Sequence, residues 1–127
     1  MYVKATFYNP IEYVEYAQGK RGLDDVRRVD LEALVDAGAT FPALPMDKAR
    51  EIGLPIVGES EAEVATGRER VRLALGVIRI EDKTAGSYIV VRPEGTTPLI
   101  GVVVLEQMGY KVDPTTGRLV KGLLLML

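Results

Sequence analysis

The amino-acid sequence contains neither cysteine nor histidine among its 127 residues. The absence of cysteine excludes disulfide bonds and thiol chemistry, and the absence of histidine removes the usual general base and the commonest metal ligand. Any acid–base catalysis near neutral pH must therefore use carboxylates, lysine or tyrosine.

Long apolar runs and a strong net charge are missing as well. No apolar segment is long enough to span a bilayer, so no membrane association is expected. Residues 1–10 alternate in polarity and carry charge early, unlike a secretory signal, which predicts a cytoplasmic protein. The net charge of −2 and the pI near 5.2 indicate no basic surface for phosphate groups, so nucleic acid is not an expected partner.

The sequence does contain enough apolar material for one folded domain. Hydrophobic residues make up 47% of the chain and charged residues 27%, and the length fits a single domain over residues 1–127. Alternating polarity predicts a mostly β fold. The predicted strands are 2–8, 28–35, 64–80, 88–92 and 118–125, with turns at 66–68, 84–87 and 113–117.

Two short helices are predicted within this β fold. Residues 45–53 begin with proline and contain an early aspartate, and Gly53 suits the end of a helix. Residues 102–108 form the second predicted helix, which ends at Gly109. Residues 9–27 contain Asn9-Pro10, two glycines and scattered charge, so we interpret them as a long hairpin loop or excursion.

Asp36 is the leading candidate for a reactive group. It follows the apolar pair Leu34-Val35 and precedes Gly38, where the backbone can turn sharply. Taken alone, the pattern Asp-x-Gly favours an ordinary turn. The residues around Asp36 are therefore what decide between a turn and a catalytic loop.

Other candidate chemistry has less support. Ser60 and Ser87 have no histidine to activate them, although a lysine base stays open as an alternative. A metal would have to be held by carboxylates alone, and Glu59, Glu61 and Glu63 are better interpreted as a solvated acidic face of a strand. No metal and no other cofactor is predicted.

Two segments carry a resemblance to a known family. Residues 36–40 read Asp-Ala-Gly-Ala-Thr and are followed by Phe-Pro-Ala-Leu-Pro, a predicted helix and Gly-Leu-Pro at 53–55. Residues 98–106 read Pro-Leu-Ile-Gly-Val-Val-Val-Leu-Glu. In order and spacing, both resemble the signatures of retropepsin-like aspartic proteases, the second being two hydrophobic residues and a glycine that enter a helix. Residues 108–120 are similar to bacterial and archaeal members, and residues 11–27 fall outside the resemblance.

The resemblance implies a closed, barrel-like acid-protease fold and an aspartic endopeptidase. Such enzymes use two carboxylates that share one proton, one as base toward water and one as acid toward the carbonyl. This chain has one such loop, so a homodimer would supply the second Asp36 across a two-fold axis. Ala37 and Gly38 would complete the active-site loop, and activity would favour mildly acidic conditions.

The resemblance also implies how a substrate would bind. The expected substrate is a polypeptide in extended conformation, contacted by Gly38 and Thr40 and covered by a mobile hairpin, the flap, whose tip is Thr66-Gly67. The apolar residues 123–127 would join a sheet between the two subunits, although a central strand of the chain's own sheet is the alternative.

The sequence departs from the family pattern at two places. Ala37 stands where the family has a threonine whose hydroxyl bonds across the dimer, and Val102-Val103 stands where a polar residue is common. These departures keep open a catalytically weak or inactive member that serves as a peptide-binding or dimerisation module. A plain structural β domain without a cleft is a further alternative.

Overall fold

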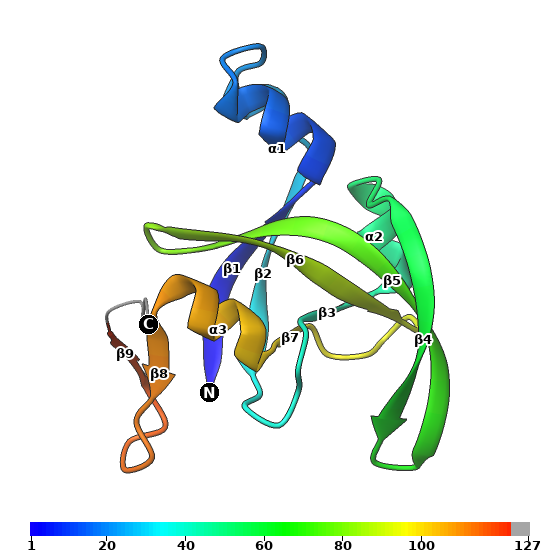
Figure 1. Ribbon diagram of the computed structural model, residues 1–127, viewed down its shortest axis with the longest axis vertical. Coiled ribbons are helices and arrows are strands. Elements are labelled where there is room, and N and C mark those ends of the chain that lie inside the picture. Colours follow the sequence, from blue (N-terminus) through cyan, green and yellow to red (C-terminus); the bar gives the residue numbers. More distant parts are fainter. Residues whose placement is uncertain (123–127) are drawn as a thin grey trace, which may run out of the picture.

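The computed structural model describes residues 1–122 and shows a mostly β protein (Figure 1). This confirms the predicted fold class. In chain order the elements are β1 (Tyr2–Tyr8), α1 (Pro10–Ala17), the 3-10 helix η1 (Leu23–Asp25), β2 (Arg28–Val35), β3 (Ala43–Pro45), α2 (Met46–Glu51), β4 (Ile56–Val64), β5 (Gly67–Ile80), β6 (Lys83–Arg92), β7 (Leu99–Ile100), α3 (Val102–Met108), β8 (Tyr110–Val112) and β9 (Leu119–Lys121).

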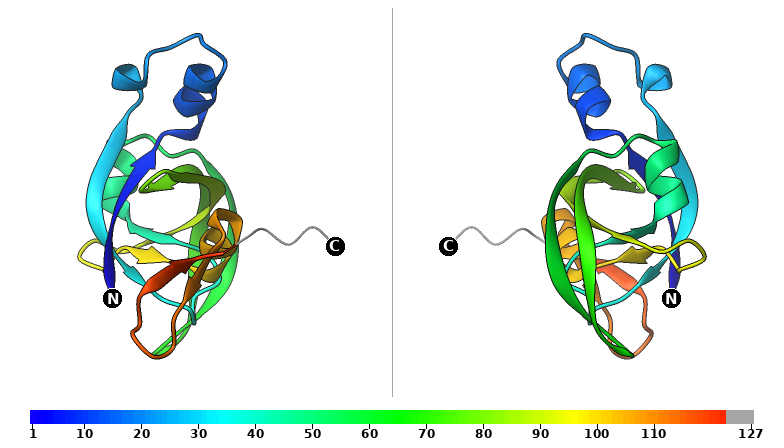
Figure 2. Two further views of the ribbon diagram at one scale, coloured as in Figure 1. Left: turned by 90° about the vertical axis from the view of Figure 1, so that its left-hand side faces the viewer. Right: turned by 90° about the vertical axis from the view of Figure 1, so that its right-hand side faces the viewer.

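Most of the strands belong to one sheet that returns onto itself. Within the described residues, the sheet has 7 strands in the order β1-β2-β7-β3-β6-β5-β4, and β1 also pairs with β5. The pairings from β1 through β6 and β5 back to β1 form a closed ring, from which β4 extends as an edge strand. Figure 2 shows the strands curving around a central core, with α1 beyond one end.

The core fills the inside of this ring. Side chains alternate between the two faces of a strand, and the residues of β5 that point inward, among them Ala74 and Ile78, are fully buried. Phe7 from β1, Leu44 from β3 and Ile100 from β7 are equally buried and belong to the same cluster. Burial of this kind stabilises a domain by about 25 cal/mol per Å² of apolar surface.

Both predicted helices are present. The helix predicted within residues 45–53 is α2, followed by Gly53 with a positive φ of 65°. The helix predicted at 102–108 is α3, and Gly109 ends it in the left-handed conformation at φ 74°. Glycine adopts this conformation at little cost, which explains why both helices stop there.

Residues 9–27 form an excursion between the antiparallel strands β1 and β2, which was one of the two predicted alternatives. The other alternative, a long hairpin loop, is wrong because α1 and η1 lie there. Asn9 caps α1: its side chain accepts a hydrogen bond from the Glu12 backbone N–H at 3.0 Å, and Pro10 occupies the first turn. The Asn9 side-chain amide also donates to the carbonyl oxygens of Ile52 and Gly53 at 3.0 and 3.1 Å, which ties α1 to the end of α2. The dipeptide Asn-Pro is common in turns and equally suits a helix start.

One predicted turn is also wrong. Residues 84–87 lie inside β6, where Ala85 pairs with Ile78 of β5. The chain reverses earlier, at Glu81 and Asp82, and Glu81 adopts a positive φ of 53°. The turns predicted at 66–68 and 113–117 do connect antiparallel strands, β4 with β5 and β8 with β9. The predicted intersubunit strand at residues 123–127 lies outside the described residues.

Candidate active site

Asp36 lies directly after β2, in the interior of the sheet rather than at its edge. Val35 and Leu34 pair in parallel with Ile100 and Leu99 of β7. The Asp36 backbone N–H donates to the Ile100 carbonyl at 3.0 Å. The position of Asp36 is therefore fixed by a strand on each side of β2, because β1 pairs along the opposite edge.

The loop after β2 turns around the Asp36 carboxylate. The Gly38 backbone N–H donates to Asp36 Oδ1 at 2.9 Å, and the Ala39 N–H donates to the Asp36 carbonyl at 3.1 Å. A Cβ at position 38 would lie only 3.2 Å from Oδ1, so glycine leaves room for this arrangement. One carboxylate oxygen is thus held by the backbone, and the side chain is half-buried.

The second segment of the resemblance packs against this loop. A Cβ at Gly101 would lie 2.6 Å from the Phe41 carbonyl carbon and 2.7 Å from the Thr40 carbonyl oxygen, so only glycine fits. The first two amides of α3 also reach the loop, because Val102 N–H donates to Ala39 O at 2.8 Å and Val103 N–H to Thr40 O at 3.1 Å. The backbone amides of Val102 and Val103 therefore anchor the loop, although neither residue has a polar side chain.

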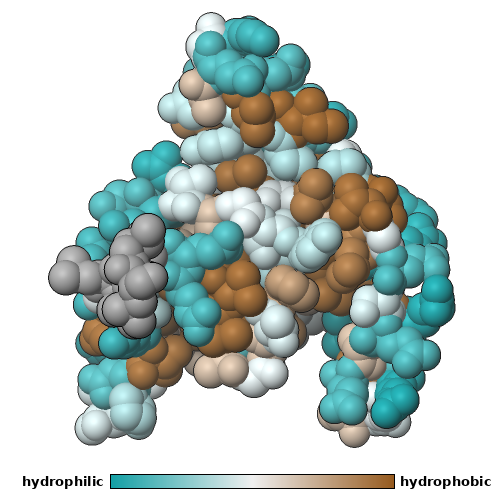
Figure 3. Space-filling model, viewed as in Figure 1, coloured by the Kyte–Doolittle hydropathy of each residue, from teal (hydrophilic) through white to brown (hydrophobic). Residues whose placement is uncertain are grey.

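A cleft of about 590 Å³ separates the Asp36 loop from the β4–β5 hairpin. In Figure 3 it opens at the bottom of the molecule, between the body and the projecting hairpin. Asp36, Gly38 and Thr40 line it. The remaining lining residues are Ala39, Phe41, Ala43, Ser60, Glu61, Ala62, Glu63, Val64, Ala65, Val71, Leu73, Val90, Arg92 and Leu99.

Three of the candidate site residues lie outside the wall of this cleft. Ala37 is exposed, and Thr66 and Gly67 lie at the tip of the hairpin beyond the lining strands. Gly67 has a positive φ of 131°, which suits a tight reversal. A separate hollow of about 650 Å³ lies against β1, β2 and η1 and contains none of the candidate residues.

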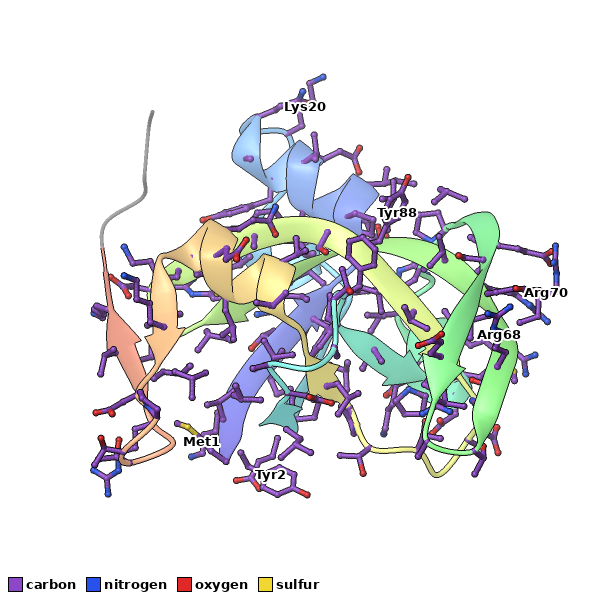
Figure 4. All side chains as sticks on the ribbon, turned by 60° about the horizontal axis from the view of Figure 1, so that its bottom comes forward. Met1, Tyr2, Lys20, Arg68, Arg70 and Tyr88 are labelled. Carbon is purple, nitrogen blue, oxygen red and sulfur yellow. The ribbon has the colours of Figure 1, made fainter. Side chains whose placement is uncertain are left out.

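The β4–β5 hairpin carries a row of exposed charges, two of which, Glu61 and Glu63, also line the cleft. Glu59, Glu61 and Glu63 of β4 are in register with arginines of β5, and Arg70 binds Glu59 at 2.9 Å. Figure 4 shows Arg70 extending away from the rest of the molecule. The three glutamates are exposed, which agrees with a solvated face.

One ion pair joins the hairpin to the body of the protein. Arg92, at the end of β6, donates through Nε and Nη2 to Glu69 Oε2 at 3.2 and 3.1 Å. Both side chains are about three-quarters buried, with 26% and 29% exposed. This pair borders the cleft, because Arg92 lines it.

The apolar wall of the cleft was not predicted from the sequence. Val71 and Leu73 come from β5, Val90 pairs with Leu73 from β6, and all three line the cleft. Their alternation indicates strands, but the face that each strand turns toward the loop depends on long-range pairing. Arg92, at the end of β6, was missed for the same reason, and Phe41 was not predicted as a cleft residue either.

A single carboxylate limits the chemistry that this arrangement can perform alone. General base catalysis toward water and general acid catalysis toward a carbonyl oxygen require two proton-transfer groups in complementary states. The Asp36 loop supplies one such group, a carboxylate held by the Gly38 backbone amide and open to the cleft.

Comparison with known proteins gives a match in fold. No family model matches the sequence, and no curated protein matches it. Solved structures do match, among them EIAV protease complexed with the inhibitor HBY-793. The TM-score is 0.58, over 66% of this chain and 82% of that chain, with 15% sequence identity.

The protein therefore has a retropepsin-like fold, the fold of a retroviral protease. At this low identity, the likeness concerns the fold alone. Over residues 1–122, none of the helices has the length and apolar character needed to cross a membrane.

Proposed function

We propose that this protein is an aspartic endopeptidase that acts as a homodimer, with one Asp36 from each subunit. The observation that supports this proposal most directly is the Asp36 carboxylate, which the Gly38 N–H holds in the lining of a cleft between the loop and the β4–β5 hairpin. The retropepsin-like fold and the order of the two sequence signatures support the same conclusion.

The mechanism needs the second subunit. Two Asp36 carboxylates facing each other share one proton: the ionised one takes a proton from water, and the protonated one donates to the carbonyl oxygen of the peptide bond. Water attacks the carbonyl carbon and gives a tetrahedral intermediate. Its C–N bond breaks as the first Asp36 gives the proton taken from water to the nitrogen, and the second Asp36 takes a proton back from a hydroxyl group of the intermediate. Activity falls at alkaline pH, where both carboxylates are ionised.

The substrate in this proposal is an extended polypeptide. It lies between the Asp36 loop and the β4–β5 hairpin, which serves as the flap with Thr66 and Gly67 at its tip. Gly38 and Thr40 contact the substrate backbone, since both line the cleft. No cofactor takes part.

Three broader assignments complete the proposal. Residues 1–127 form one domain, which the single closed sheet supports. The chain belongs to the bacterial and archaeal branch of the retropepsin-like proteases, on the resemblance at residues 108–120. The protein works in the cytoplasm.

The test is cleavage of an unfolded protein mixture from acidic to neutral pH by three proteins: the unsubstituted chain, Asp36→Asn and Ala37→Thr. Asp36→Asn keeps the shape of the side chain and removes its base, so cleavage should fall by a factor of about a thousand or more. Ala37→Thr restores a hydroxyl that can bond across the dimer, so cleavage should rise. Cleavage that survives in the Asp36→Asn protein would falsify the mechanism.

The absence of a hydroxyl group at Ala37 favours a second candidate function: a module that binds peptides without cleaving them. A missing hydroxyl bond between the two loops costs about 1 kcal/mol and loosens the geometry that catalysis requires. An extended peptide can still pair with strand edges by β-augmentation. Saturable binding of an unfolded peptide, with no cleavage in either the unsubstituted or the Ala37→Thr protein, would favour this function.

A further inference from the structure

The apolar wall of the cleft continues beyond the cleft itself. Leu73 and Val90 are paired in register on β5 and β6, and both line the cleft. The next pair on the same face is Leu75 with Tyr88, because side chains two residues apart share a face of the sheet. Leu75 is 40% exposed and Tyr88 43%, so this second pair presents apolar surface to solvent.

Phe41 connects this exposed pair to the Asp36 loop. It lines the cleft, and its ring packs edge-on against Tyr88 with centroids 5.5 Å apart and an interplanar angle of 83°. The Phe41 carbonyl also packs against Gly101, so the backbone that carries the ring is fixed. Figure 4 shows Tyr88 near the middle of β6, and Figure 3 shows hydrophobic residues gathered on this side of the molecule.

We propose that Phe41, Leu75 and Tyr88 form a ledge that binds a bulky apolar side chain of the polypeptide substrate, beyond the part of the cleft that holds the scissile bond. The inference rests on the proposed function, because its occupant is the peptide that the cleft takes. The ledge and the cleft share Phe41, so one peptide can contact both.

The geometry also specifies the substrate pattern. A strand rises about 3.3 Å per residue, so the pairs Leu73–Val90 and Leu75–Tyr88 are about 7 Å apart along the sheet. In an extended peptide, residues i and i+2 have the same spacing and point the same way. The ledge therefore selects peptides with apolar residues at two alternate positions on one side of the scissile bond.

The test measures binding separately from cleavage. The Asp36→Asn protein is titrated into fluorescent peptides that carry one fixed leucine and a second leucine moved one position at a time through a serine-rich sequence. The peptide with its leucines at i and i+2 should bind about five to ten times more tightly than a matched peptide with serine in the distal position. Tyr88→Thr and Leu75→Thr, each added to Asp36→Asn, should abolish that preference.

Threonine suits an exposed strand, and circular dichroism together with sedimentation verifies that each variant folds and keeps its oligomeric state. The control is Val14→Thr, which changes a 51% exposed residue on α1 and should leave the preference intact. The ledge is wrong if the preference is absent, or if it is as large in both ledge variants as in the control.

Cleavage of the same peptides by the unsubstituted chain separates this inference from the proposed function. If the chain cleaves all peptides with equal kcat/KM and binding shows no preference, the protease function stands and the ledge is wrong. If binding shows the preference and no peptide is cleaved, the ledge stands and the catalytic proposal fails.

Discussion

The Asp36 loop and the β4–β5 hairpin face each other across the cleft, but the protein holds them by different means. The loop is fixed by backbone hydrogen bonds to β7 and α3 and by the close contact at Gly101. The outer half of the hairpin is held by its own ladder, because β5 pairs with β6 only from Arg72 onward, and the Glu69–Arg92 pair joins this outer half to β6. Catalysis requires a fixed carboxylate, whereas substrate entry requires a cover that can open, so the two walls match the two demands.

The largest expected difference between the walls is in stability. Ile100 is fully buried beneath the Asp36 loop, so Ile100→Ala should lower the free energy of unfolding by about 2 to 5 kcal/mol. Val64 is half-buried on the hairpin, and Val64→Ala should cost less than about 1 kcal/mol. Urea unfolding at one fixed protein concentration measures the loss of stability in both variants. Equal losses would contradict the claim that the loop wall is held more firmly than the hairpin wall.

The close contact at Gly101 allows a test of how the loop wall positions Asp36. Gly101→Ala puts a methyl group against the carbonyls of Phe41 and Thr40, so the loop must shift, at a cost of about 1 to 3 kcal/mol. Cleavage should fall more than stability alone explains, because Asp36 moves with the loop. Gly86→Ala is the control, since a Cβ there meets nothing within 4 Å. Equal kcat/KM for the two variants would show that the contact does not position Asp36.

The ion pair on the hairpin should act locally. Glu69→Gln weakens the bond to Arg92, and since both side chains are only partly buried we expect a loss of about 1 kcal/mol or less. Hydrogen exchange should become faster in β4 and the adjoining half of β5 and stay unchanged in β2 and β7. The exposed pair Glu59–Arg70 gives the matched control, because Glu59→Gln should change neither. A uniform increase in exchange would contradict a separately mobile hairpin.

The smallest effect is expected at α1, outside both walls. The Arg27 backbone N–H, and then its guanidinium, holds the pKa of Glu12 below its ordinary value of 4.5. A lowered pKa in the folded state adds stability that is fully present above about pH 4.5 and is lost as the pH falls below it. Glu12→Gln should therefore cost a few tenths of a kcal/mol at pH 7 and less at pH 3, measured by urea unfolding. If Glu12→Gln costs as much stability at pH 3 as at pH 7, its effect does not come from the lowered pKa of Glu12.

The two walls also differed in how far the sequence predicted them. The Asp36 loop was predicted from the resemblance of residues 36–40 and the segments after them to a family signature, and α3 from an apolar run that ends at Gly109. The signal for the hairpin turn was local as well. The pairing of Leu99 and Ile100 with β2 was not predictable, because a two-residue strand has no measurable period and its partner is distant in sequence.

The same reasoning explains the remaining failures. Asn9-Pro10 supported a long hairpin loop or excursion although Asn9 caps α1, because the dipeptide fits both a loop and a helix start. Leu73, Val90 and Arg92 became cleft residues only once the register of β5 and β6 was known. The resemblance around Asp36 predicted the catalytic candidate, and tertiary pairing determined which residues surround it.

The central claim is that each active site needs Asp36 from two subunits, and subunit mixing tests it most directly. Unsubstituted and Asp36→Asn chains are mixed in equal amounts at constant total concentration, allowed to exchange, and assayed for cleavage at mildly acidic pH. If both aspartates are required, only the unsubstituted dimers cut, and activity should fall to roughly a quarter of the unmixed value. Activity of roughly one half would mean that each subunit works with its own Asp36, and would contradict the account.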